Sequence, residues 1–545
     1  MKSKLIKTSF ASGELMPELY GRSDLQTYQN GASELTNVNV LTTGGVIRRS
    51  GSLLVGLVPN GAKLFGFSVS ENDYMAVFYD KKVDVYNGLN KVSTLDTPYG
   101  LADLKDLFLQ HNNNNLWICS GKYPIKRIVF ENNTFAINEP SFSGLPNNVF
   151  NANDGYAKTV GFYQGRVILA GTNKYPNRIW FSKSGSMDDF SLGKALDDEG
   201  IDINLLSSGN DFITGIYCGA NLIIFTNAGE WIIKGEPITP NDIVASKYSS
   251  IGSPRDRRID IVGTEKKVLF VNALNNNIYG FEQDKSISLS FSSEAMVSLS
   301  RHLSKNITAM AYSEKHHRLF CVKEDGKMMV VNFDYTEGVF AISKYETDGL
   351  YKAVSVNKDY IYTVVLRNNK YYIEVFSKTV LMDCCVVKQS QTKKYKFTGF
   401  NQHNNKTLMV VADDILRSNH EIKNNELTLT DSAKKVVVGY KYPHTIKSLP
   451  LNNDYAGSKV RIRKITVKLN KTASLRIDFG KGFNLMPFKK FGTGIMGKPI
   501  ELYSGDKTIN VLGWKTYNND HLWTVSDDSP LPMTILSIKT DISIN

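Results

Sequence analysis

Short apolar segments joined by polar turns recur through the first 380 residues, and this repetition limits the possible folds more than any other feature. Each unit has two runs rich in Val, Ile, Tyr and Phe, separated by Asn, Asp, Gly or Lys. Such runs predict β-hairpins, because branched and aromatic side chains suit a pleated surface and the turn residues tolerate tight backbone turns. The turns centre near residues 81, 132, 174, 228, 276, 325 and 368.

The spacing of these turns predicts how the hairpins assemble. Successive centres lie 42 to 54 residues apart, close to the ~40–50 residues of a four-stranded propeller blade. A single blade cannot bury both of its faces, so closure into a ring is favoured. We therefore predict a mainly β protein with a β-propeller of about six or seven blades over residues 56–390. Stacked β-sandwiches with regular hairpins are the alternative, because the units share no strong sequence identity.

The charge of the chain changes near residue 390. In residues 391–545, Lys and Arg number 24 against 13 Asp and Glu, so this part holds nearly all of the net charge of +12. Strand-like patterns continue there without the blade spacing. Residues 391–545 are therefore predicted to form a separate, basic β-rich domain that meets an anionic partner.

The clearest strand of this domain spans residues 459–469. Val460 and Ile462 alternate with cations, and the apolar alternation resumes one residue out of phase at Ile465. A β-bulge near Arg463–Lys464 would explain the shift and keep the cations on the polar face. The candidate contacts to DNA or another anion are Arg461, Arg463, Lys464 and Lys468. This face could line a channel, lie outside or at a subunit interface, or simply be solvated.

Residues 483–497 mix apolar side chains with glycines and are too irregular for a strand. The segment predicts either a mobile apolar loop that could plug a channel without holding phosphates, or a loop packed over the core of its own domain. The candidate gate residues are Phe483, Leu485, Met486, Phe488, Phe491 and Met496.

Residues 1–55 have little capacity to fold alone. Pro17 stops any helix, and glycines supply turns or close backbone approach. These glycines are Gly13, Gly21, Gly31, Gly44 and Gly45. We expect an N-terminal arm or platform that is ordered by packing on another domain or subunit. A cap on the first blade of the propeller is the alternative.

The chain lacks recognisable catalytic chemistry. It contains no metalloprotease, serine-hydrolase or phosphate-loop motif. Its five cysteines are scattered without Cys-x-x-Cys spacing and predict buried thiols in a reducing compartment. The acidic clusters at 188–189 and 197–199 fit solvated loops better than paired catalytic carboxylates. We therefore predict no enzyme activity, no catalytic residues, no cofactor and no metal site. No secretory signal or membrane span is visible.

The N-terminal segment carries a specific pattern of residues. It reads Phe10-x-Ser12-Gly13-Glu14-Leu15-x-Pro17, then Gly21-Arg22-x-Asp24, Tyr28 and Arg48-Arg49, with Gly165-Arg166 and Gly229-Glu230-Trp231 further on. In these positions the chain resembles the tail nozzle, or tail tubular protein B, family of short-tailed bacteriophages.

The resemblance implies a virion structural protein of the distal tail, made in the host cytoplasm. Such a protein forms a hexameric ring that continues and closes the DNA channel and opens for genome ejection. The implied partners are further copies of the chain, a tail adaptor, tail fibres or spikes, double-stranded genomic DNA and the host outer-membrane surface. The implied adaptor or subunit docking residues are Phe10, Gly13, Glu14, Pro17, Gly21, Arg22, Asp24, Tyr28, Arg48 and Arg49.

Two other functions remain open at this point. One is a glycan-binding or glycan-cleaving propeller at the tip of a phage tail. The other is a cellular propeller scaffold with a nucleic-acid-binding tail.

Overall fold

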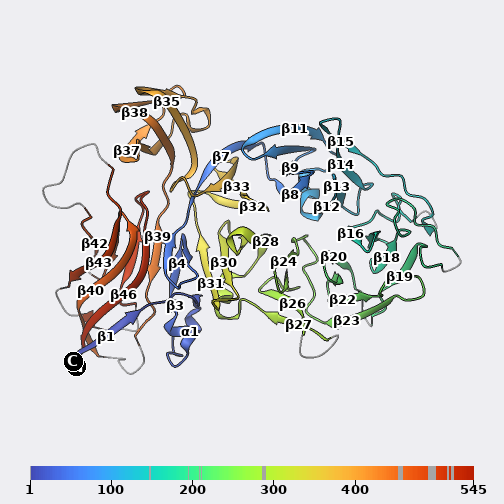
Figure 1. Cartoon of the computed structure of the whole chain (residues 1–545), viewed down its shortest axis with the longest axis horizontal. Helices are drawn as coiled ribbons and strands as arrows, with labels where there is room; N and C mark the ends of the chain where they lie inside the picture. Colours follow the sequence, from blue (N-terminus) through green and yellow to red (C-terminus); the bar gives the residue numbers. More distant parts are fainter. Residues whose placement is uncertain are drawn as a thin grey trace.

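The computed structural model describes residues 2–146, 149–193, 196–207, 209, 211–284, 290–451, 458–480, 482–488, 499–511, 515–516 and 521–544. Strands dominate these residues. They form a ring of blades and, beside it, a β-sandwich with a further small β-extension (Figure 1).

Seven four-stranded antiparallel units make up the ring. Blade 1 has β8 (Lys63–Val69), β9 (Asn72–Tyr79), β10 (Lys82–Asn87) and β11 (Asn90–Asp96); blade 2 has β12 (Phe108–Asn112), β13 (Asn115–Cys119), β14 (Lys126–Glu131) and β15 (Thr134–Asn138); blade 3 has β16 (Thr159–Tyr163), β17 (Arg166–Ala170), β18 (Arg178–Phe181) and β19 (Ile201–Asn204); blade 4 has β20 (Ile213–Cys218), β21 (Leu222–Thr226), β22 (Gly229–Lys234) and β23 (Val244–Ser249).

The remaining blades continue the same pattern. Blade 5 has β24 (Val262–Gly263), β25 (Val268–Val271), β26 (Ile278–Asp284) and β27 (Ser290–Ala295); blade 6 has β28 (Ile307–Ser313), β29 (Arg318–Lys323), β30 (Met328–Asp334) and β31 (Val339–Tyr345); blade 7 has β32 (Leu350–Asn357), β33 (Tyr360–Arg367), β34 (Lys370–Ser377) and β7 (Gly51–Val58). At six of the seven junctions, the first strand of a blade packs against the first strand of the next, so these strands surround the channel. The predicted propeller is confirmed, with seven blades.

Local turn chemistry explains several of the hairpins. Asn132–Asn133 and Asn368–Asn369 each have two successive residues with positive φ, of 49° and 63° and of 47° and 61°. Two such residues form the type I′ turn, whose twist matches that of the flanking strands. Asn adopts this conformation more readily than most residues with a Cβ, so the sequence marks these turns directly.

The strand β7 closes the ring. It pairs antiparallel with β34, from Gly51 opposite Ser377 to Val58 opposite Tyr371. Hydrogen bonds between strands far apart in the sequence therefore hold the first and last blades together. The predicted boundary at residue 55 falls inside this strand, because the segment that closes the ring precedes the first complete blade.

Two sheets beside the ring form the sandwich. One contains β1 (Lys2–Lys7), β46 (Thr534–Ile544), β40 (Lys459–Thr472), β43 (Tyr503–Asn510), β44 (Lys515–Thr516), β6 (Val46–Arg48) and β5 (Val38–Val40); the other extends blade 6 with β4 (Glu34–Thr36), β39 (His444–Lys447), β45 (Thr524–Asp527), β41 (Arg476–Asp478) and β42 (Phe483–Leu485). Their buried core mixes residues from both ends of the chain, such as Phe10, Leu35, Ile465 and Trp523.

The β-extension continues blade 7 beyond β7. It consists of β35 (Asp383–Thr398), β38 (Glu426–Tyr440), β36 (Thr407–Ala412) and β37 (Ile415–Glu421). Residues 391–545 are thus divided between this extension and the sandwich, and the sandwich also needs residues from the predicted N-terminal arm. The N-terminal strands complete both sheets, and Phe10, Leu35 and Val46 supply part of the shared buried core.

The remaining elements are short. They are β2 (Gly13–Glu14), β3 (Gly31–Ala32), α1 (Gln26–Gln29) and the 3₁₀ turns η1 (Pro17–Leu19), η2 (Leu101–Asp106), η4 (Ser298–Leu303), η5 (Glu314–His316) and η6 (Asn401–His403). No helix in the described part of the chain is long and apolar enough to cross a membrane.

Candidate anion-binding face

The four cations predicted from the sequence all lie on β40. Ile462, Ile465 and Val467 point into the sandwich core, while Lys464 and Lys468 are exposed on the other side. The pairing of β40 with β46 shifts register between Ile462 and Lys464. This irregularity is the predicted β-bulge, and it keeps the cations outward although the sequence alternation slips by one residue.

Neighbouring strands add cations that the sequence did not suggest. On β46, Asp541 lies opposite Lys464, and Lys539 lies opposite Thr466. On β1, Lys4 lies opposite the same Asp541, and Lys2 lies opposite Ser543. Opposed residues of adjacent strands point to the same side of a sheet, so these lysines share the face of Lys464.

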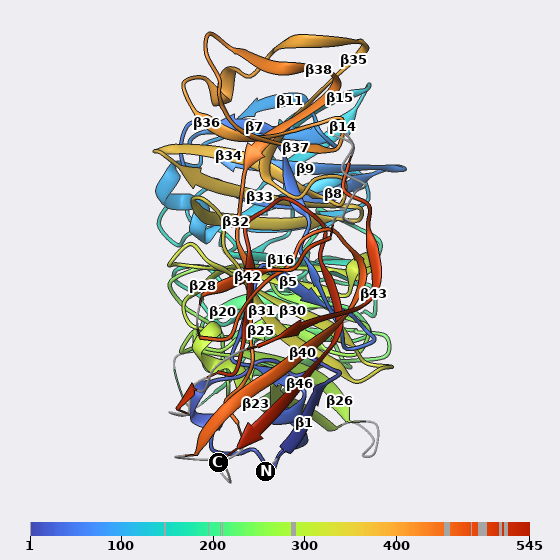
Figure 2. The same cartoon turned by 90° about the vertical axis from the view of Figure 1, so that its left-hand side faces the viewer.

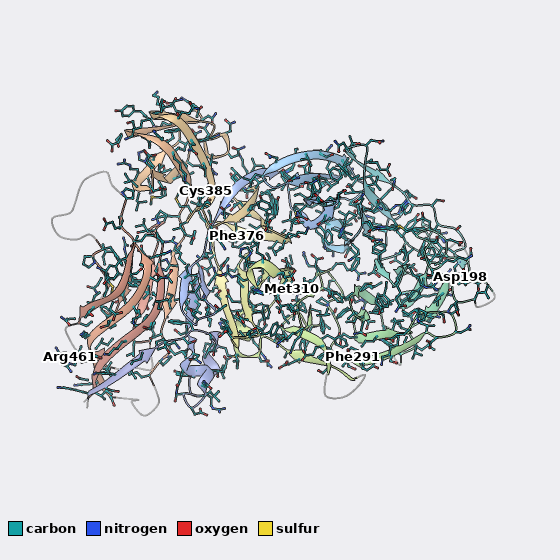
Figure 3. All side chains as sticks on the ribbon, viewed as in Figure 1. Asp198, Phe291, Met310, Phe376, Cys385 and Arg461 are labelled. Atoms are coloured by element: carbon teal, nitrogen blue, oxygen red, sulfur yellow. The ribbon has the colours of Figure 1, made fainter. Side chains whose placement is uncertain are left out.

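We call this surface the basic face. It comprises Lys2, Lys4, Arg461, Arg463, Lys464, Lys468 and Lys539, with Asp506 and Asp541 as its carboxylates. The strands that carry it are in front in Figure 2, and Arg461 lies at the side of the molecule away from the ring in Figure 3. Seven cations against two carboxylates make this face strongly positive.

Strand geometry sets the size of the basic face. Strands rise about 3.3 Å per residue and lie about 4.8 Å apart. The cations on β40 therefore extend over roughly 23 Å, and β1, β46 and β40 add about 10 Å across. The result is a band of positive charge, elongated along β40.

One lysine of β1 is used differently. Lys7 points inward, donates hydrogen bonds to the backbone carbonyls of Gln29 and Gly31 (2.5 Å to Gly31), and its ammonium lies 5.2 Å from the ring of Phe10. Burial lowers its pKa to about 7. Lys7 therefore anchors β1 to the N-terminal segment and is not part of the basic face.

The predicted gate residues do not form one apolar cluster. Phe483 and Leu485 are exposed on β42, whereas Met486 is buried in the sandwich core and Phe488 packs against that core. Lys507 lies 4.8 Å from the Phe488 ring. The described part of the segment thus fits the alternative of a loop packed over its own domain. Phe491 and Met496 lie outside the described residues.

Most predicted docking residues are buried within the folded chain. Phe10, Gly13, Glu14, Tyr28, Arg48 and Arg49 are buried. Glu14 accepts a hydrogen bond from the Leu35 amide at 2.8 Å and contacts His302 at 2.9 Å. At Gly13, which has φ of 69°, a Cβ would lie 2.1 Å from the backbone nitrogen of Ile342.

These contacts correct the docking prediction. The buried side chains bind the N-terminal segment to the chain's own ring and sandwich, so they are not exposed on the surface of the chain. Only Pro17, Gly21, Arg22 and Asp24 of the predicted set are exposed. The N-terminal segment packs on another part of the structure, as its glycines suggested, and that part belongs to the same chain.

Arg49 is fully buried. Its side chain is 0% exposed and makes two hydrogen bonds to the Asp383 carboxylate, at 2.8 and 2.7 Å. The guanidinium also donates to Asn37 and stacks on the Tyr442 ring at 3.6 Å. Burial alone would lower the pKa of Arg49, but the Asp383 carboxylate raises it well above its usual range. The pair ties the N-terminal segment to β35.

The acidic clusters of the ring have local structural roles. Asp189 accepts hydrogen bonds from the amide and hydroxyl of Ser191, and Glu199 accepts one from the Leu196 amide. Arg166 binds the backbone carbonyls of Asp197 and Glu199. In the described residues, no group of three His, Cys, Asp or Glu side chains could hold a metal ion.

The cysteines agree with the predicted buried thiols. All five are free, and four of them are buried, with Cys218 partly so. Burial raises the pKa of Cys218 to about 12. Such thiols stay protonated and unreactive at neutral pH.

The fold and the basic face together define a β-propeller protein with an attached basic β-sandwich. No family model and no curated protein matches the chain. Solved structures that match include the β-propeller domain of Cps50 (Swd1) from Myceliophteria thermophila, at TM-score 0.40 and 10% identity over 60% of this chain and 100% of that chain. The WD40 repeats of RRP9 match at a TM-score of 0.39 and 8% identity, over 61% of this chain and 100% of that chain. BBS1N in complex with ARL6DN matches at a TM-score of 0.38 and 12% identity, over 61% of this chain and 98% of that chain.

These comparisons correct the predicted function. The matching structures named above are propellers of other proteins and include no phage tail protein, so the expectation of a tail nozzle is wrong against this finding. At these identities and TM-scores the matching structures concern the fold alone. The family resemblance, the ring of several copies and the virion location stay predictions, because no comparison tests them.

Proposed function

We propose that this protein is a non-catalytic binding scaffold that holds duplex nucleic acid against the basic face. The observation that carries the proposal is the gathering of seven cations, from three strands at opposite ends of the chain, on one outer sheet surface. Fixed cations on a rigid sheet bind phosphates without reading sequence, because the phosphate backbone dominates nucleic-acid affinity.

The shape of the basic face favours a linear polyanion over a small anion. Duplex DNA carries one negative charge per about 1.7 Å of helix axis. A band of roughly 23 Å therefore meets several phosphates of one duplex at once. The two carboxylates, Asp506 and Asp541, leave a large excess of positive charge, so the face attracts the duplex even at moderate salt.

The salt dependence of binding tests this proposal. If about five cations contact phosphates, the logarithm of the binding constant falls with the logarithm of salt concentration with a slope of about −4.5. Replacing Lys464 and Lys468 together with Gln weakens binding and makes the slope shallower by about 2, because each lost phosphate contact removes about 0.9. The measurement is fluorescence anisotropy of the full chain with a labelled duplex of random sequence, at about 50 to 200 mM KCl.

A charge-matched control separates the basic face from net charge. Lys393 and Lys394 are also exposed, but they lie on β35 of the β-extension. The Lys393→Gln/Lys394→Gln variant should keep the wild-type slope. The proposal fails if both double variants change the slope equally, if no binding is measured at the lowest salt, or if poly-glutamate of equal charge displaces the duplex as well as unlabelled DNA does.

A further inference from the structure

The centre of the propeller holds a second cationic site, which is separate from the basic face. A cavity of about 70 Å³ opens at the mouth of the channel, between the starts of the inner strands of blades 1, 6 and 7. The turn η2 and the linker between blades 4 and 5 complete its wall. Its charged lining residues are Lys63, Lys105, Arg257, Arg258, Asp260 and Lys352.

The linker between blades 4 and 5 builds one side of this cavity. The Arg258 amide donates a hydrogen bond to the carbonyl of Lys105 at 2.9 Å, which ties the linker to η2. The Arg258 guanidinium donates to the backbone carbonyls of Ile213 and Thr214, at 3.2 Å to Ile213. Asp260 forms an ion pair with Lys63 of blade 1 at 3.4 Å. The linker therefore reaches across the channel and is fixed at both ends.

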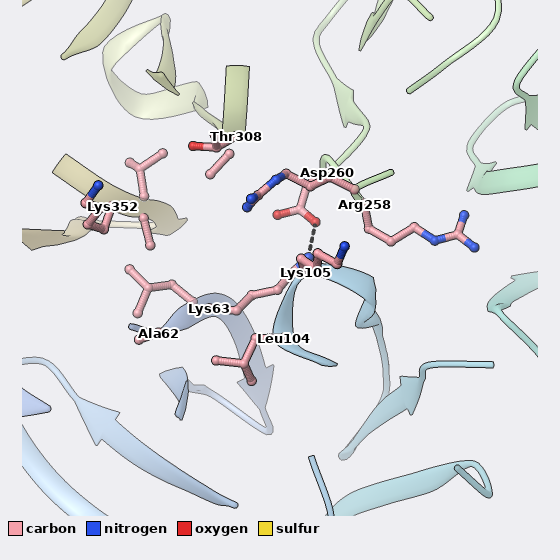
Figure 4. Close-up of a pocket in the computed structure, with 13 residues that line it drawn as sticks. Ala62, Lys63, Leu104, Lys105, Arg258, Asp260, Thr308 and Lys352 are labelled. Carbon is pink, nitrogen blue, oxygen red and sulfur yellow. Dashed lines mark ion pairs between the residues drawn. The ribbon is translucent and has the colours of Figure 1, made fainter. Parts of the chain in front are cut away.

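The cations of the cavity outnumber its carboxylates. Figure 4 shows one ion pair among the lining residues, between Lys63 and Asp260. Lys63 also donates to the carbonyl of Leu107 at 2.9 Å. In the described part of the chain, no carboxylate lies within ion-pair distance of Lys105, Arg257 or Lys352. Three cations on three different elements thus surround the opening without a counter-charge.

Burial shifts the pKa of two basic groups at or beside the cavity. Burial lowers the pKa of Arg258 to about 10, although nearby Asp106 opposes this shift. Burial and the positive charge of Arg258 lower the pKa of Lys158, on the adjacent side of the channel. An anion in the cavity would oppose these shifts, since an opposite charge stabilises the charged form of each base.

We propose that the channel mouth binds a phosphate group. The Arg258 guanidinium is bound to backbone carbonyls, but four other cationic side chains line the cavity with one carboxylate, so a doubly charged anion neutralises the site better than a carboxylate does. The volume suits one oxyanion group, since sites for drug-sized ligands measure about 300–1,000 Å³. Arg257 offers the planar pair of donors that matches phosphate oxygens, and Lys105 and Lys352 supply point charges. The phosphate is either free inorganic phosphate or the phosphate of an ester.

Calorimetric titration of the full chain at constant ionic strength tests the proposal. Inorganic phosphate should bind saturably at one site per chain, and sulfate should compete because it has the same shape and charge, whereas acetate should not bind measurably. The Arg257→Gln/Lys352→Gln variant should bind phosphate about 100-fold more weakly, because two charge-assisted hydrogen bonds are lost. O-phosphoserine distinguishes the sources: tighter binding than inorganic phosphate identifies an ester, and weaker binding identifies free phosphate.

Two charge-matched variants make the test independent of the proposed nucleic-acid function. Lys393→Gln/Lys394→Gln and Lys464→Gln/Lys468→Gln each remove two exposed cations elsewhere, and both should bind phosphate as the wild type does. Equal loss in all three variants, or equal binding of acetate and phosphate, would overturn the proposal. If the double channel variant does not fold, the single replacement Arg257→Gln at an exposed position should still weaken binding about tenfold.

Discussion

Replacing Arg49 with Met is expected to lower the free energy of unfolding by about 3–5 kcal/mol. The change removes the partner of the Asp383 carboxylate, whose side chain is 2% exposed. Asp383 would keep one side-chain hydrogen bond, from the Thr347 hydroxyl at 2.7 Å. A buried carboxylate that loses its cation cannot regain hydration, so the folded state bears most of this penalty. Chemical denaturation followed by circular dichroism measures the effect.

The chain offers a matched control for this prediction. Arg22 and Asp24 form the same two-bond pair, with both distances 2.9 Å, but on the surface. Arg22→Met should leave unfolding unchanged within error, because water solvates the remaining carboxylate. The double variant Arg49→Met/Asp383→Leu should recover much of the lost stability, since neither charge of this pair then stays buried alone. An Arg49→Met protein as stable as the wild type would contradict the structural role assigned to the pair.

The second large effect is loss of stability in acid through His403. The ring is 0% exposed, its Nε2–H donates to the Cys384 carbonyl at 2.9 Å, and it packs edge-on against Tyr440. Burial, together with the charges of Lys406 and Arg367, lowers the pKa of His403 to about 4, although the hydrogen bond to Cys384 opposes this shift. Because the folded-state pKa lies below the unfolded value of about 6.5, the unfolded chain binds a proton first as the pH falls.

The stabilisation that depends on neutral His403 is therefore complete above pH 6.5 and is lost as the pH falls toward 4. One pKa unit corresponds to about 1.4 kcal/mol, so the loss over this window is about 3 kcal/mol. His403→Gln keeps a neutral donor and does not titrate. Between pH 7 and pH 4, the unfolding free energy of the wild type should fall by about 3 kcal/mol more than that of the His403→Gln variant.

Comparing variants removes the contribution of the other titrating groups, which include buried His444. His317 serves as the control, because its side chain is 52% exposed at a turn and its ring contacts water in both the folded and unfolded states. His317→Gln should follow the wild-type pH dependence. A His403→Gln protein with the same pH dependence as wild type would show that the ring does not stay neutral in the fold.

The residue pattern of the N-terminal segment reflects contacts within the chain. Gly13 allows the backbone to approach Ile342, and Arg49 fills a site lined by Asp383, Asn37 and Tyr442. Charged and glycine residues at fixed spacing suggested a surface for another protein. The same spacing is required by contacts within one chain, and a sequence pattern does not distinguish the two cases.

The sequence alone determined the propeller, because hairpins are local. Turn residues such as Asn132–Asn133 and the alternation of side chains lie within a few residues of each other, so each blade is visible without its neighbours. The cationic strand and its bulge were predictable for the same reason, since the phase slip at Arg463–Lys464 is a local feature.

Only the tertiary structure decided how distant segments pair. The closing strand β7 joins β34, and Lys2 and Lys4 reach the basic face through the pairing of β1 with β46. The phosphate site likewise needs a linker that spans the channel. Strands pair through backbone groups that every residue carries, so side-chain patterns predict that a strand forms but do not name its partner.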